Sequence, residues 1–414
     1  MVTTANRVTS FPKEDIKVLL LENVHASAHE IFGAEGYNVE AVPRALKEEE
    51  LIERLADGVH LLGIRSKTRV TAKALEAGKR LLSVGAFCIG TNQIDLDAAK
   101  RCGVPVFNAP FSNTRSVAEL VICEIIMLSR HLGDRSREVH EGRWRKIAKG
   151  SREVRGKTLG IVGYGHIGSQ VGVMAEAMGM RVISFDVKAT LSLGNNRAET
   201  SLETLLAMSD FVTLHVPETP QTKNMIGAAE LAVMKDDACL LNLSRGSVVD
   251  LDALAEAIKA GKLGGAALDV YPEEPEGNED VFESVVRGLP NVVLTPHIGG
   301  STSEAQESIG REVANTLTRY TNTGATTGAV NLPLIEHPKL PGAHRVLNVH
   351  RNVPGVLRDI NKIVSDRNAN VLGQVLATDA DVGYLVMDLD KNLAEDVRAA
   401  IKALSTSIRT RILY

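Results

Sequence analysis

Cysteine is scarce in the sequence, and its few copies are scattered. Four occur in 414 residues, with no CxxC spacing and no grouping with histidines; they are Cys88, Cys102, Cys123 and Cys239. A zinc site needs closely spaced Cys or His ligands, and a disulfide framework is typical of short secreted chains with paired cysteines. We therefore expect no metal site and no disulfide framework, and we expect reduced thiols, as in cytoplasmic proteins.

A basic excess and a long apolar run are also missing. The sequence has 47 Lys and Arg residues and 51 Asp and Glu residues, which gives a formal net charge of −4. No excess of positive charge therefore supports binding to nucleic acid. The longest apolar stretch, residues 118–128, is interrupted by Glu119 and Glu124, whereas a membrane-spanning helix needs about 20 apolar residues. Residues 1–17 lack the apolar core of a signal peptide. These absences predict a soluble cytoplasmic protein without a membrane partner.

The remaining composition is that of an ordinary globular protein, with 44% hydrophobic and 24% charged residues. At about 150 residues per domain, the chain is long enough for two or three domains. Short β-rich apolar runs alternate with helical patterns, as in α/β proteins whose parallel strands are buried on both faces. The expected strands are residues 16–21, 59–64, 81–86, 158–163, 181–186, 211–216, 238–243, 265–270 and 291–296.

Two segments divide the chain. Residues 113–132 have apolar side chains at helical spacing after a capping residue, Asn113 or Thr114. We expect one long helix there, connecting an upstream α/β block to a second block that begins near Gly156. Residues 331–342 contain three prolines and a glycine, which predicts a linker.

The segment after the linker has the element order of a small separate domain. Its pattern predicts four strands and two helices in the order βαββαβ, a ferredoxin-like unit. The strands are expected at 345–350, 371–378, 382–390 and 407–414, and the helices at 354–366 and 393–404.

The clearest functional motif is a glycine-rich turn. Gly163, Gly165 and Gly168 form a GxGxxG that follows an expected strand and opens a helical run. The first glycine permits the tight turn, the second lets backbone N–H groups approach a pyrophosphate, and the third lets helix and strand pack closely. The next strand ends in Asp186, whose carboxylate can accept from both ribose hydroxyls and repels a 2′-phosphate. The motif predicts a dinucleotide site that prefers NAD, although Lys188 slightly weakens that preference.

Polar residues follow three expected strands downstream, at the edge where an open α/β sheet binds its ligands. They are Arg245, the neighbouring acids Glu273 and Glu274, and His297. A histidine can take the hydroxyl proton during hydride transfer, a carboxylate on its other nitrogen fixes the tautomer, and an arginine can hold a substrate carboxylate. The residues alone do not distinguish Glu273 from Glu274. The pattern predicts a dehydrogenase for a small hydroxy acid.

Four blocks of sequence carry these motifs. They are GIVGYGHIG (160–168), NLSRGSVVD (242–250), DVYPEEP (269–275) and LTPHIGGST (294–302). They resemble the signature blocks of the D-isomer-specific 2-hydroxyacid dehydrogenases. Residues 85–120 resemble the members of that family that act on 3-phosphoglycerate, and the C-terminal unit resembles an ACT regulatory domain. The resemblance covers nearly the whole chain, from about residue 12 to the end.

The resemblance implies a fold and an activity. A Rossmann-type cofactor domain, residues 113–299, is inserted in a flavodoxin-like substrate domain formed by residues 12–112 and 300–341, and the ferredoxin-like ACT domain follows at 342–414. The implied reaction is NAD-dependent oxidation of 3-phospho-D-glycerate to 3-phosphohydroxypyruvate, the first step of phosphorylated L-serine synthesis. Feedback inhibition by L-serine and assembly as a homotetramer are implied in the same way.

The resemblance also assigns roles to single residues. It implies Arg245, Glu274 and His297 as the catalytic set, and so chooses Glu274 over Glu273. The NAD contacts that it implies are Gly163, Gly165, His166, Ile167, Gly168, Asp186, Leu243, Ser244, Arg245, Asp269, His297, Ile298, Gly299 and Gly300.

A phosphorylated substrate needs additional cations, because its phosphate carries about two extra negative charges. Lys67 stands where some relatives have Arg, and Lys lacks the two-pronged hydrogen bond of a guanidinium. The residues that the resemblance implies for substrate binding, some of them from a neighbouring subunit, are Arg44, Arg65, Ser66, Lys67, Asn113 and Lys146.

The ACT-like unit is expected to bind serine. The implied residues are His350 and Asn352, between the first strand and first helix, and Asn370, before the second strand. A helix N-terminus offers N–H donors to a carboxylate, and an Asn carbonyl accepts from an ammonium group.

Two other functions fit the same residues. One is a dehydrogenase for an unphosphorylated 2-hydroxy acid such as 2-hydroxyglutarate. The other is a nicotinamide-sensing binding protein, which the joint presence of Arg245, Glu274 and His297 disfavours. Loss of phosphate-dependent activity when Arg65 and Lys67 are removed separates the first from the main hypothesis. NADH binding without turnover would favour the second.

Overall fold

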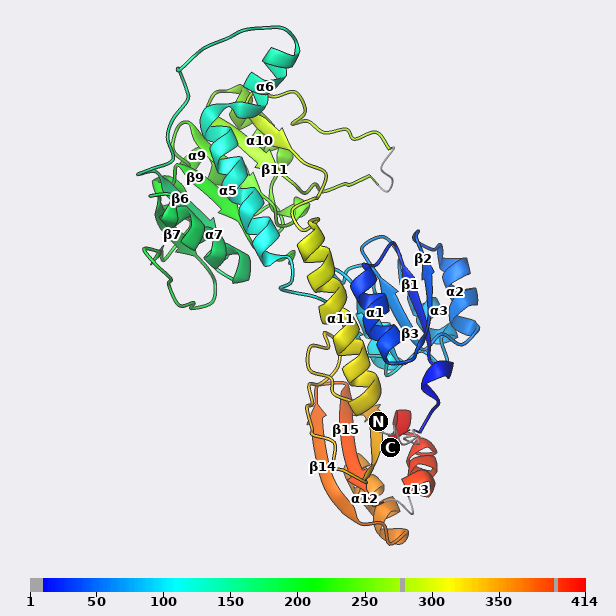
Figure 1. The fold of residues 1–414 in the computed structure, drawn as a ribbon. Helices are drawn as coiled ribbons and strands as arrows, with labels where there is room; N and C mark the ends of the chain where they lie inside the picture. The colour runs from blue at the N-terminus through cyan, green and yellow to red at the C-terminus, as the bar shows by residue number, and fades with distance from the viewer. Residues whose placement is uncertain (1–9, 276–279, 391–393) are drawn as a thin grey trace, which may run out of the picture. The chain divides into compact units, whose positions relative to one another are not determined.

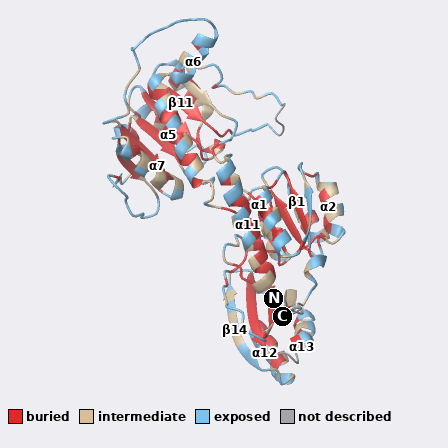
Figure 2. Ribbon diagram, in the orientation of Figure 1, coloured by how far each residue is buried: buried red, intermediate tan, exposed pale blue. Residues whose placement is uncertain are grey.

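The computed structural model describes residues 10–275, 280–390 and 394–414 (Figure 1). Within these ranges the chain forms three β-sheets, and it divides into two compact units, Met1–Ser112 with Gln306–Tyr414, and Asn113–Ala305. Most residues of the central strands are buried, as the continuous apolar runs predict (Figure 2). Residues 1–9 of the polar N-terminal segment, and Leu393 of the last expected helix, lie outside the described residues.

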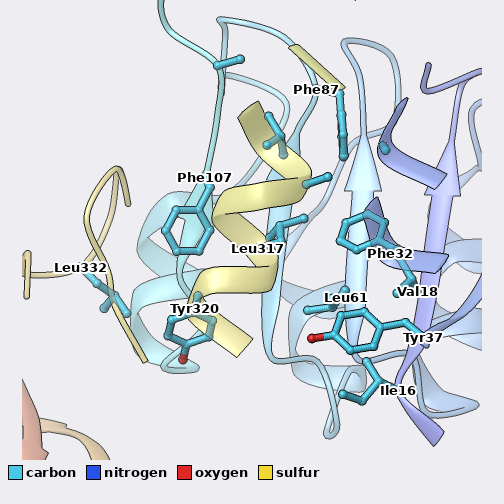
Figure 3. Close-up of a cluster of buried hydrophobic side chains, with 14 of the residues drawn as sticks. Ile16, Val18, Phe32, Tyr37, Leu61, Phe87, Phe107, Leu317, Tyr320 and Leu332 are labelled. Carbon is cyan, nitrogen blue, oxygen red and sulfur yellow. The ribbon is translucent and has the colours of Figure 1, made fainter. Parts of the chain in front are cut away.

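The first sheet is parallel and has the strand order β2-β1-β3-β4-β5 of flavodoxin-like folds, which confirms that expectation. Helices α1 and α11 pack on one face, and α2, α3 and α4 pack on the other. Figure 3 shows the first of these cores, in which Leu317 and Tyr320 of α11 join Phe32 of α1 and Leu61 of β3. The elements are β1 (Lys17–Leu21), α1 (Ala26–Ala34), β2 (Asn38–Val42), α2 (Glu48–Ala56), β3 (Leu61–Ile64), α3 (Ala72–Ala77), β4 (Ser83–Ala86), α4 (Leu96–Arg101), β5 (Val106–Phe107) and α11 (Ser303–Thr323).

The second sheet is also parallel, and its order is β12-β11-β10-β9-β6-β7-β8. This is the order of dinucleotide-binding sheets, in which the chain reverses direction across the sheet between β6 and β9. Helices α5 and α7 cover one face, and α8, α9 and α10 cover the other. The strands are β6 (Thr158–Val162), β7 (Arg181–Phe185), β8 (Arg197–Ala198), β9 (Phe211–Leu214), β10 (Ala238–Asn242), β11 (Leu263–Leu268) and β12 (Val292–Leu294). The helices are α5 (Thr114–Arg130), α6 (Leu132–His140), α7 (His166–Ala177), α8 (Leu202–Met208), α9 (Ala228–Val233) and α10 (Leu251–Lys259).

The third sheet is antiparallel, with the order β14-β15-β13-β16. Helices α12 and α13 pack on one face, so the predicted βαββαβ unit is confirmed. The other face continues the core of the first sheet, because Leu347 and Tyr384 are buried with α11. The elements are β13 (His344–Arg351), α12 (Val356–Asp366), β14 (Val371–Thr378), β15 (Val382–Leu389), α13 (Ala394–Lys402) and β16 (Ser407–Leu413).

The sequence pattern does not predict three short strands, β2, β5 and β8. Strands β2 and β8 lie at sheet edges and are largely exposed, so they carry no continuous apolar run. Strand β5 has two residues and is also at an edge. The helix expected over residues 113–132 ends at Arg130, because His131 has a left-handed backbone with φ of 50°. A second helix, α6, follows directly.

Candidate active site

The glycine turn joins β6 to α7, and its three glycines meet different surroundings. Gly163 has φ of +92°, and a Cβ there would lie 2.4 Å from the carbonyl oxygen of His215. A Cβ on Gly168 would lie 2.3 Å from the carbonyl oxygen of Gly163. A Cβ on Gly165, by contrast, would meet no atom of the described residues within 4 Å. The turn is therefore tightly packed at Gly163 and Gly168 and open at Gly165. Gly165 directly precedes the N-terminal end of α7, where His166 and Ile167 lie.

Asp186 follows β7 and lies against the same turn. Its Oδ2 accepts a hydrogen bond from the backbone N–H of Tyr164 at 2.9 Å, and its Oδ1 accepts from the N–H of Lys188 at 2.9 Å. The two bonds hold the carboxylate beside the glycine turn. Each oxygen keeps a further lone pair, which the hydroxyls of a ribose could use.

His215, which was not predicted from the sequence, follows β9, the strand next to β6 on the other side of the reversal point. Its Nε2 lies 3.0 Å from Oγ1 of Thr213, and its Nδ1 is buried without a hydrogen-bond partner in the described part of the chain. Burial lowers the pKa of His215 to about 3, so the ring is neutral. An unpartnered polar atom beside Gly163 fits a site that a polar cofactor completes. No helical or strand periodicity and no motif in the sequence indicates a role for His215.

The segment after β10 carries Arg245, and Asn242 holds its backbone. Oδ1 of Asn242 accepts from the N–H of Ser244 at 3.1 Å, and Nδ2 of Asn242 donates to the carbonyl of Arg245 at 2.9 Å. The Arg245 guanidinium donates to the carbonyl of Ser244 at 2.6 Å. Leu243 and Ser244 are buried, and Arg245 is half-buried, so the loop presents the guanidinium at the carboxyl edge of the sheet.

Asp269, at the end of β11, holds the turn after β12. It is 1% exposed. Its Oδ1 accepts from the N–H of Ile298 at 2.8 Å and from Oγ1 of Thr295 at 2.6 Å, while its Oδ2 accepts from the N–H of Gly299 at 2.8 Å. A Cβ on Gly299 would lie 2.9 Å from Oδ2, so the turn approaches the carboxylate closely because glycine stands there.

His297 is paired with Glu274, the acid that the family resemblance implied and that the residues alone did not distinguish from Glu273. Nδ1 of His297 lies 3.0 Å and 2.8 Å from Oε1 and Oε2 of Glu274, and in the described residues Glu273 makes no such contact. The hydrogen bond with Glu274 raises the pKa of His297, although burial opposes the shift. Burial alone would raise the pKa of Glu274, but the contact with His297 lowers it below its usual value. His297 has φ of 53°, a backbone conformation that few non-glycine residues adopt.

Two further residues border this turn. Asn113, at the N-terminal end of α5, is close enough to Gly300 that a Cβ there would lie 2.3 Å from Nδ2 of Asn113. Oδ1 of Asn113 is buried without a partner among the described residues. Tyr271 donates its N–H to Glu274 at 3.2 Å and its hydroxyl to the carbonyl of Thr295 at 3.0 Å, so it links the two segments. Asn113 was among the residues predicted from the sequence, whereas Tyr271 was not.

Three of the cations that were expected to bind the substrate phosphate, Arg44, Arg65 and Lys67, belong to the unit Met1–Ser112 with Gln306–Tyr414. They lie on two loops of the first sheet. Arg65, Ser66 and Lys67 follow β3, and the carboxylate of Glu22 accepts from the N–H of Lys67 at 2.9 Å and from that of Thr68 at 2.8 Å. Glu22 therefore shapes this loop.

The other two cations that were expected to bind phosphate are Arg44 and Lys146. Arg44, after β2, is paired with Glu50 at 2.7 Å, and Lys146 lies in an exposed stretch of the other unit. Neither environment by itself marks an anion site.

The expected serine residues do not converge within one chain. His350 is 3% exposed at the end of β13, and Asn352 donates to the carbonyl of Asp379 at 2.6 Å. Asn370 precedes β14, whose first residue, Val371, aligns with Leu389 at the opposite end of the sheet. Asn370 lies beside Asp390 and Asn352 beside Asp381, so at roughly 3.3 Å per strand residue the two asparagines are about 30 Å apart.

The second sheet therefore brings the predicted cofactor and catalytic residues of its unit to one edge, at the carboxyl ends of its strands. An open, glycine-lined helix N-terminus, an acid after the second strand and an unpartnered His215 nitrogen fit an NAD molecule. Among residues 10–275, 280–390 and 394–414, no group of three His, Cys, Asp or Glu side chains could hold a metal ion. In the same ranges no helix combines the length and apolar character needed to span a bilayer.

The fold and this edge define an NAD-dependent oxidoreductase. Residues 122–299 match the family described as D-isomer specific 2-hydroxyacid dehydrogenase, NAD binding domain, and residues 347–410 match the AHAS small subunit-like ACT domain. The chain belongs to the D-isomer-specific 2-hydroxyacid dehydrogenase family, as the sequence blocks predicted.

Its similarity to individual family members extends over the whole chain. It is 53% identical to D-3-phosphoglycerate dehydrogenase of Dictyostelium discoideum over 406 residues, covering 98% of this chain and 99% of that protein. It is 50% identical to the protein of that name from Escherichia coli K12 over 408 residues, with the same coverage. Among solved structures it resembles the NAD-complexed D-isomer specific 2-hydroxyacid dehydrogenase from Lactobacillus delbrueckii ssp. bulgaricus. That match has 27% identity and a TM-score of 0.66, over 76% of this chain and 100% of the other.

Proposed function

We propose that the protein oxidises 3-phospho-D-glycerate at its hydroxyl-bearing carbon to 3-phosphohydroxypyruvate, the step that begins phosphorylated L-serine synthesis. The observation that carries the proposal is the His297–Glu274 pair at the carboxyl edge of an NAD-binding sheet. Full-length similarity to D-3-phosphoglycerate dehydrogenases supports the choice of substrate and favours it over both alternatives. NAD, when bound, accepts the hydride.

The proposed roles follow from the chemistry of each side chain. With Nδ1 engaged by Glu274, the Nε2 of His297 is the ring nitrogen free to take the hydroxyl proton. Glu274 stabilises the imidazolium that results. Arg245 holds the substrate carboxylate with parallel hydrogen bonds and polarises the developing carbonyl. Asp186 and the glycine turn hold the dinucleotide, and Asp269 keeps the 297–300 turn in place for it.

The proposed base can be tested with His297→Asn. We expect kcat for 3-phosphoglycerate oxidation to fall by about 10²- to 10⁴-fold, because the reaction loses its general base. The KM for NAD should change little. His140→Asn, an exposed position on α6, is the matched control and should keep wild-type rates. A His297→Asn enzyme with near wild-type kcat would show that another group takes the proton.

The phosphate requirement distinguishes the proposed substrate from an unphosphorylated hydroxy acid. Arg65→Ala/Lys67→Ala should raise the KM for 3-phosphoglycerate by roughly tenfold or more, since each charged hydrogen bond contributes about 1.5–3 kcal/mol. Activity on 2-hydroxyglutarate should be unaffected by the same change. Arg69→Ala/Lys73→Ala removes two exposed cations nearby and serves as the control. Equal losses on both substrates would support the alternative dehydrogenase.

The nicotinamide-sensing alternative makes a different prediction. Such a protein would bind NADH without catalysing turnover of any 2-hydroxy acid. A steady-state assay of 3-phosphohydroxypyruvate reduction by NADH decides between the two, because turnover excludes a role in binding alone.

We also propose that L-serine inhibits a cytoplasmic homotetramer through the ACT domain. Since Asn352 and Asn370 lie at opposite ends of one sheet, a serine site that uses both requires two copies of the chain. The shared site needs only two copies, whereas the proposed homotetramer should give about four times the 44.5 kDa chain mass in sedimentation analysis. Asn352→Ala and Asn370→Ala should each abolish serine inhibition, whereas Asn361→Ala, on the exposed side of α12, should not. Serine inhibition of a monomeric enzyme would contradict the shared site.

A further inference from the structure

A large basic cleft lies within the unit Met1–Ser112 with Gln306–Tyr414, between the first sheet and the ACT-like unit. Its volume is about 1690 Å³, and its walls include the end of α3, the end of α11, helix α13 and strand β16. This exceeds the roughly 300–1,000 Å³ of typical small-molecule pockets. Every residue that lines the cleft belongs to this unit, whereas the glycine turn, His297 and Arg245 belong to the other.

The side chains that line the cleft carry an excess of positive charge. Eight Lys and Arg residues line it, against two Glu residues. Five of the cations make no ion pair within the described part of the chain; they are Lys79, Arg80, Lys402, Arg409 and Arg411. Residues 1–9 and 391–393, which the structure does not describe, contain no Asp or Glu. The chain itself therefore leaves most of this positive charge uncompensated.

Arg409 and Arg411 are the least exposed of these cations. They alternate along β16 and pair with Val349 and Leu347, whose side chains belong to the core shared with α11, so both arginines extend to that face of the sheet. Arg409 donates to the carbonyls of Leu81 and Lys79. Arg411 donates to the carbonyl of Thr321 at 3.1 Å, and its guanidinium lies over the ring of Tyr320, 5.1 Å from the centroid. Its Nη1 is buried without a hydrogen-bond partner among the described residues.

Partly buried cations without counter-charges are unfavourable, so their presence needs an explanation. Burial and the neighbouring Arg411 lower the pKa of Arg409, which reflects desolvation and mutual repulsion. Burial, followed by the charge of Arg80, lowers the pKa of His60 in the same cleft to about 4. A bound polyanion would relieve the repulsion and satisfy the free nitrogen of Arg411.

We propose that this cleft binds a small polyanion, which is a molecule with two or more phosphate or carboxylate groups. The polyanion contacts both β16 of the ACT-like unit and the segment that follows α3. Lys79 and Arg80 come from the segment after α3, whereas Lys402, Arg409 and Arg411 come from the ACT-like unit. The ligand therefore strengthens the contact between the segment after α3 and the ACT-like unit. It is a regulator distinct from serine. Multiple charges are required because five unpaired cations face one space.

Calorimetric titration of the full chain in phosphate-free buffer at physiological ionic strength tests the proposal, with pyrophosphate, citrate and inorganic phosphate as probes. We expect pyrophosphate or citrate to bind at least tenfold more tightly than phosphate. Binding of both identifies charge as the determinant, and binding of pyrophosphate alone identifies phosphate groups. If neither binds more tightly than inorganic phosphate, the proposal is wrong.

Variants locate the binding. Arg80→Gln/Lys402→Gln changes two exposed residues and should weaken binding about tenfold or more, and Arg411→Gln should do so independently. Lys73→Gln/Lys362→Gln removes the same charge outside the cleft and should not weaken it. Arg65→Ala/Lys67→Ala should also leave it intact, because those residues belong to the proposed substrate site. Equal weakening by the Lys73/Lys362 control, or loss only in the Arg65/Lys67 variant, would place the anion elsewhere.

Discussion

Nδ1 of His297 lies within 3.0 Å of both carboxylate oxygens of Glu274, although the two residues are 23 positions apart. The contact assigns one ring nitrogen to the carboxylate and leaves the other for substrate. It also stabilises the protonated ring, as the raised pKa of His297 and the lowered pKa of Glu274 indicate. The pair therefore controls the pH range in which His297 can act as a base.

Glu274→Gln should shift the pH dependence of the oxidation reaction. Wild-type kcat/KM should rise with pH as His297 loses its proton, with a midpoint above the ordinary histidine pKa because Glu274 favours the charged ring. Removing the negative charge lowers that pKa, so the midpoint should move to lower pH. The maximal rate should fall as well, since the imidazolium formed in the reaction is less stabilised.

A pH–rate profile of both enzymes provides the measurement. Glu273→Gln is the matched control, because Glu273 makes no hydrogen bond to His297 in the described residues, and its profile should match that of the wild type. A midpoint that stays in place in Glu274→Gln, or that moves upward, would contradict this account of the pair.

Gly163→Ala should impair cofactor binding. A Cβ at this position would lie 2.4 Å from the carbonyl oxygen of His215, and the φ of +92° is unfavourable for alanine. The turn must shift, and we expect the Kd for NADH, measured by fluorescence titration, to increase about tenfold or more. Gly33→Ala, in α1, meets no atom of the described residues within 4 Å and should leave NADH binding unchanged. Wild-type NADH binding by Gly163→Ala would show that the turn tolerates a side chain.

Asp186→Ser should reduce the preference for NAD over NADP. The substitution removes a charge that repels the 2′-phosphate and an acceptor for the ribose hydroxyls. We expect the ratio of kcat/KM for NAD to that for NADP to fall by about tenfold or more, at about 1.4 kcal/mol per tenfold change. Lys188→Ala should change the ratio in the opposite direction, and slightly. An unchanged ratio in Asp186→Ser would mean that other residues select the cofactor.

Arg345→Met should destabilise the ACT-like unit. Arg345 and Asp388 are 1% and 0% exposed and are joined by two 2.7 Å hydrogen bonds, and Arg345 also donates to the carbonyls of Thr323, His337 and Pro338. Without Arg345, the buried Asp388 would keep only His337 beside it, whose Nε2 lies 3.2 Å from its Oδ2. This loss should lower the free energy of unfolding by about 3–5 kcal/mol in urea denaturation.

The exposed pair Lys362–Asp366 supplies the comparison, because exposed ion pairs contribute only about 0–1 kcal/mol. Lys362→Met should therefore leave the urea midpoint nearly unchanged. If Arg345→Met and Lys362→Met have the same small effect, the buried pair is not a structural requirement of the unit.

Much of the fold could be predicted from local pattern, because continuous apolar runs and helical spacing report burial directly. The expected runs at 158–163, 181–186 and 211–216 became β6, β7 and β9, and the βαββαβ order of the last unit was correct. The edge strands β2 and β8 escaped prediction because exposed strands need no apolar run. The long helix ends at Arg130 because of the left-handed backbone conformation of His131, which the periodicity of apolar side chains does not reveal.

The cofactor turn, the α/β class and the residue types available for catalysis could all be predicted from the sequence, because they depend on short-range spacing and chemical identity. The folded chain supplied the contact that puts Glu274, the residue implied by the family resemblance, beside His297. It also showed that Asn352 and Asn370 lie at opposite ends of one sheet, and it revealed the unpartnered nitrogens of His215 and Arg411. The physical reason is that distance, burial and hydrogen-bond satisfaction belong to pairs of residues remote in the chain. They come into being only when strands align and helices pack.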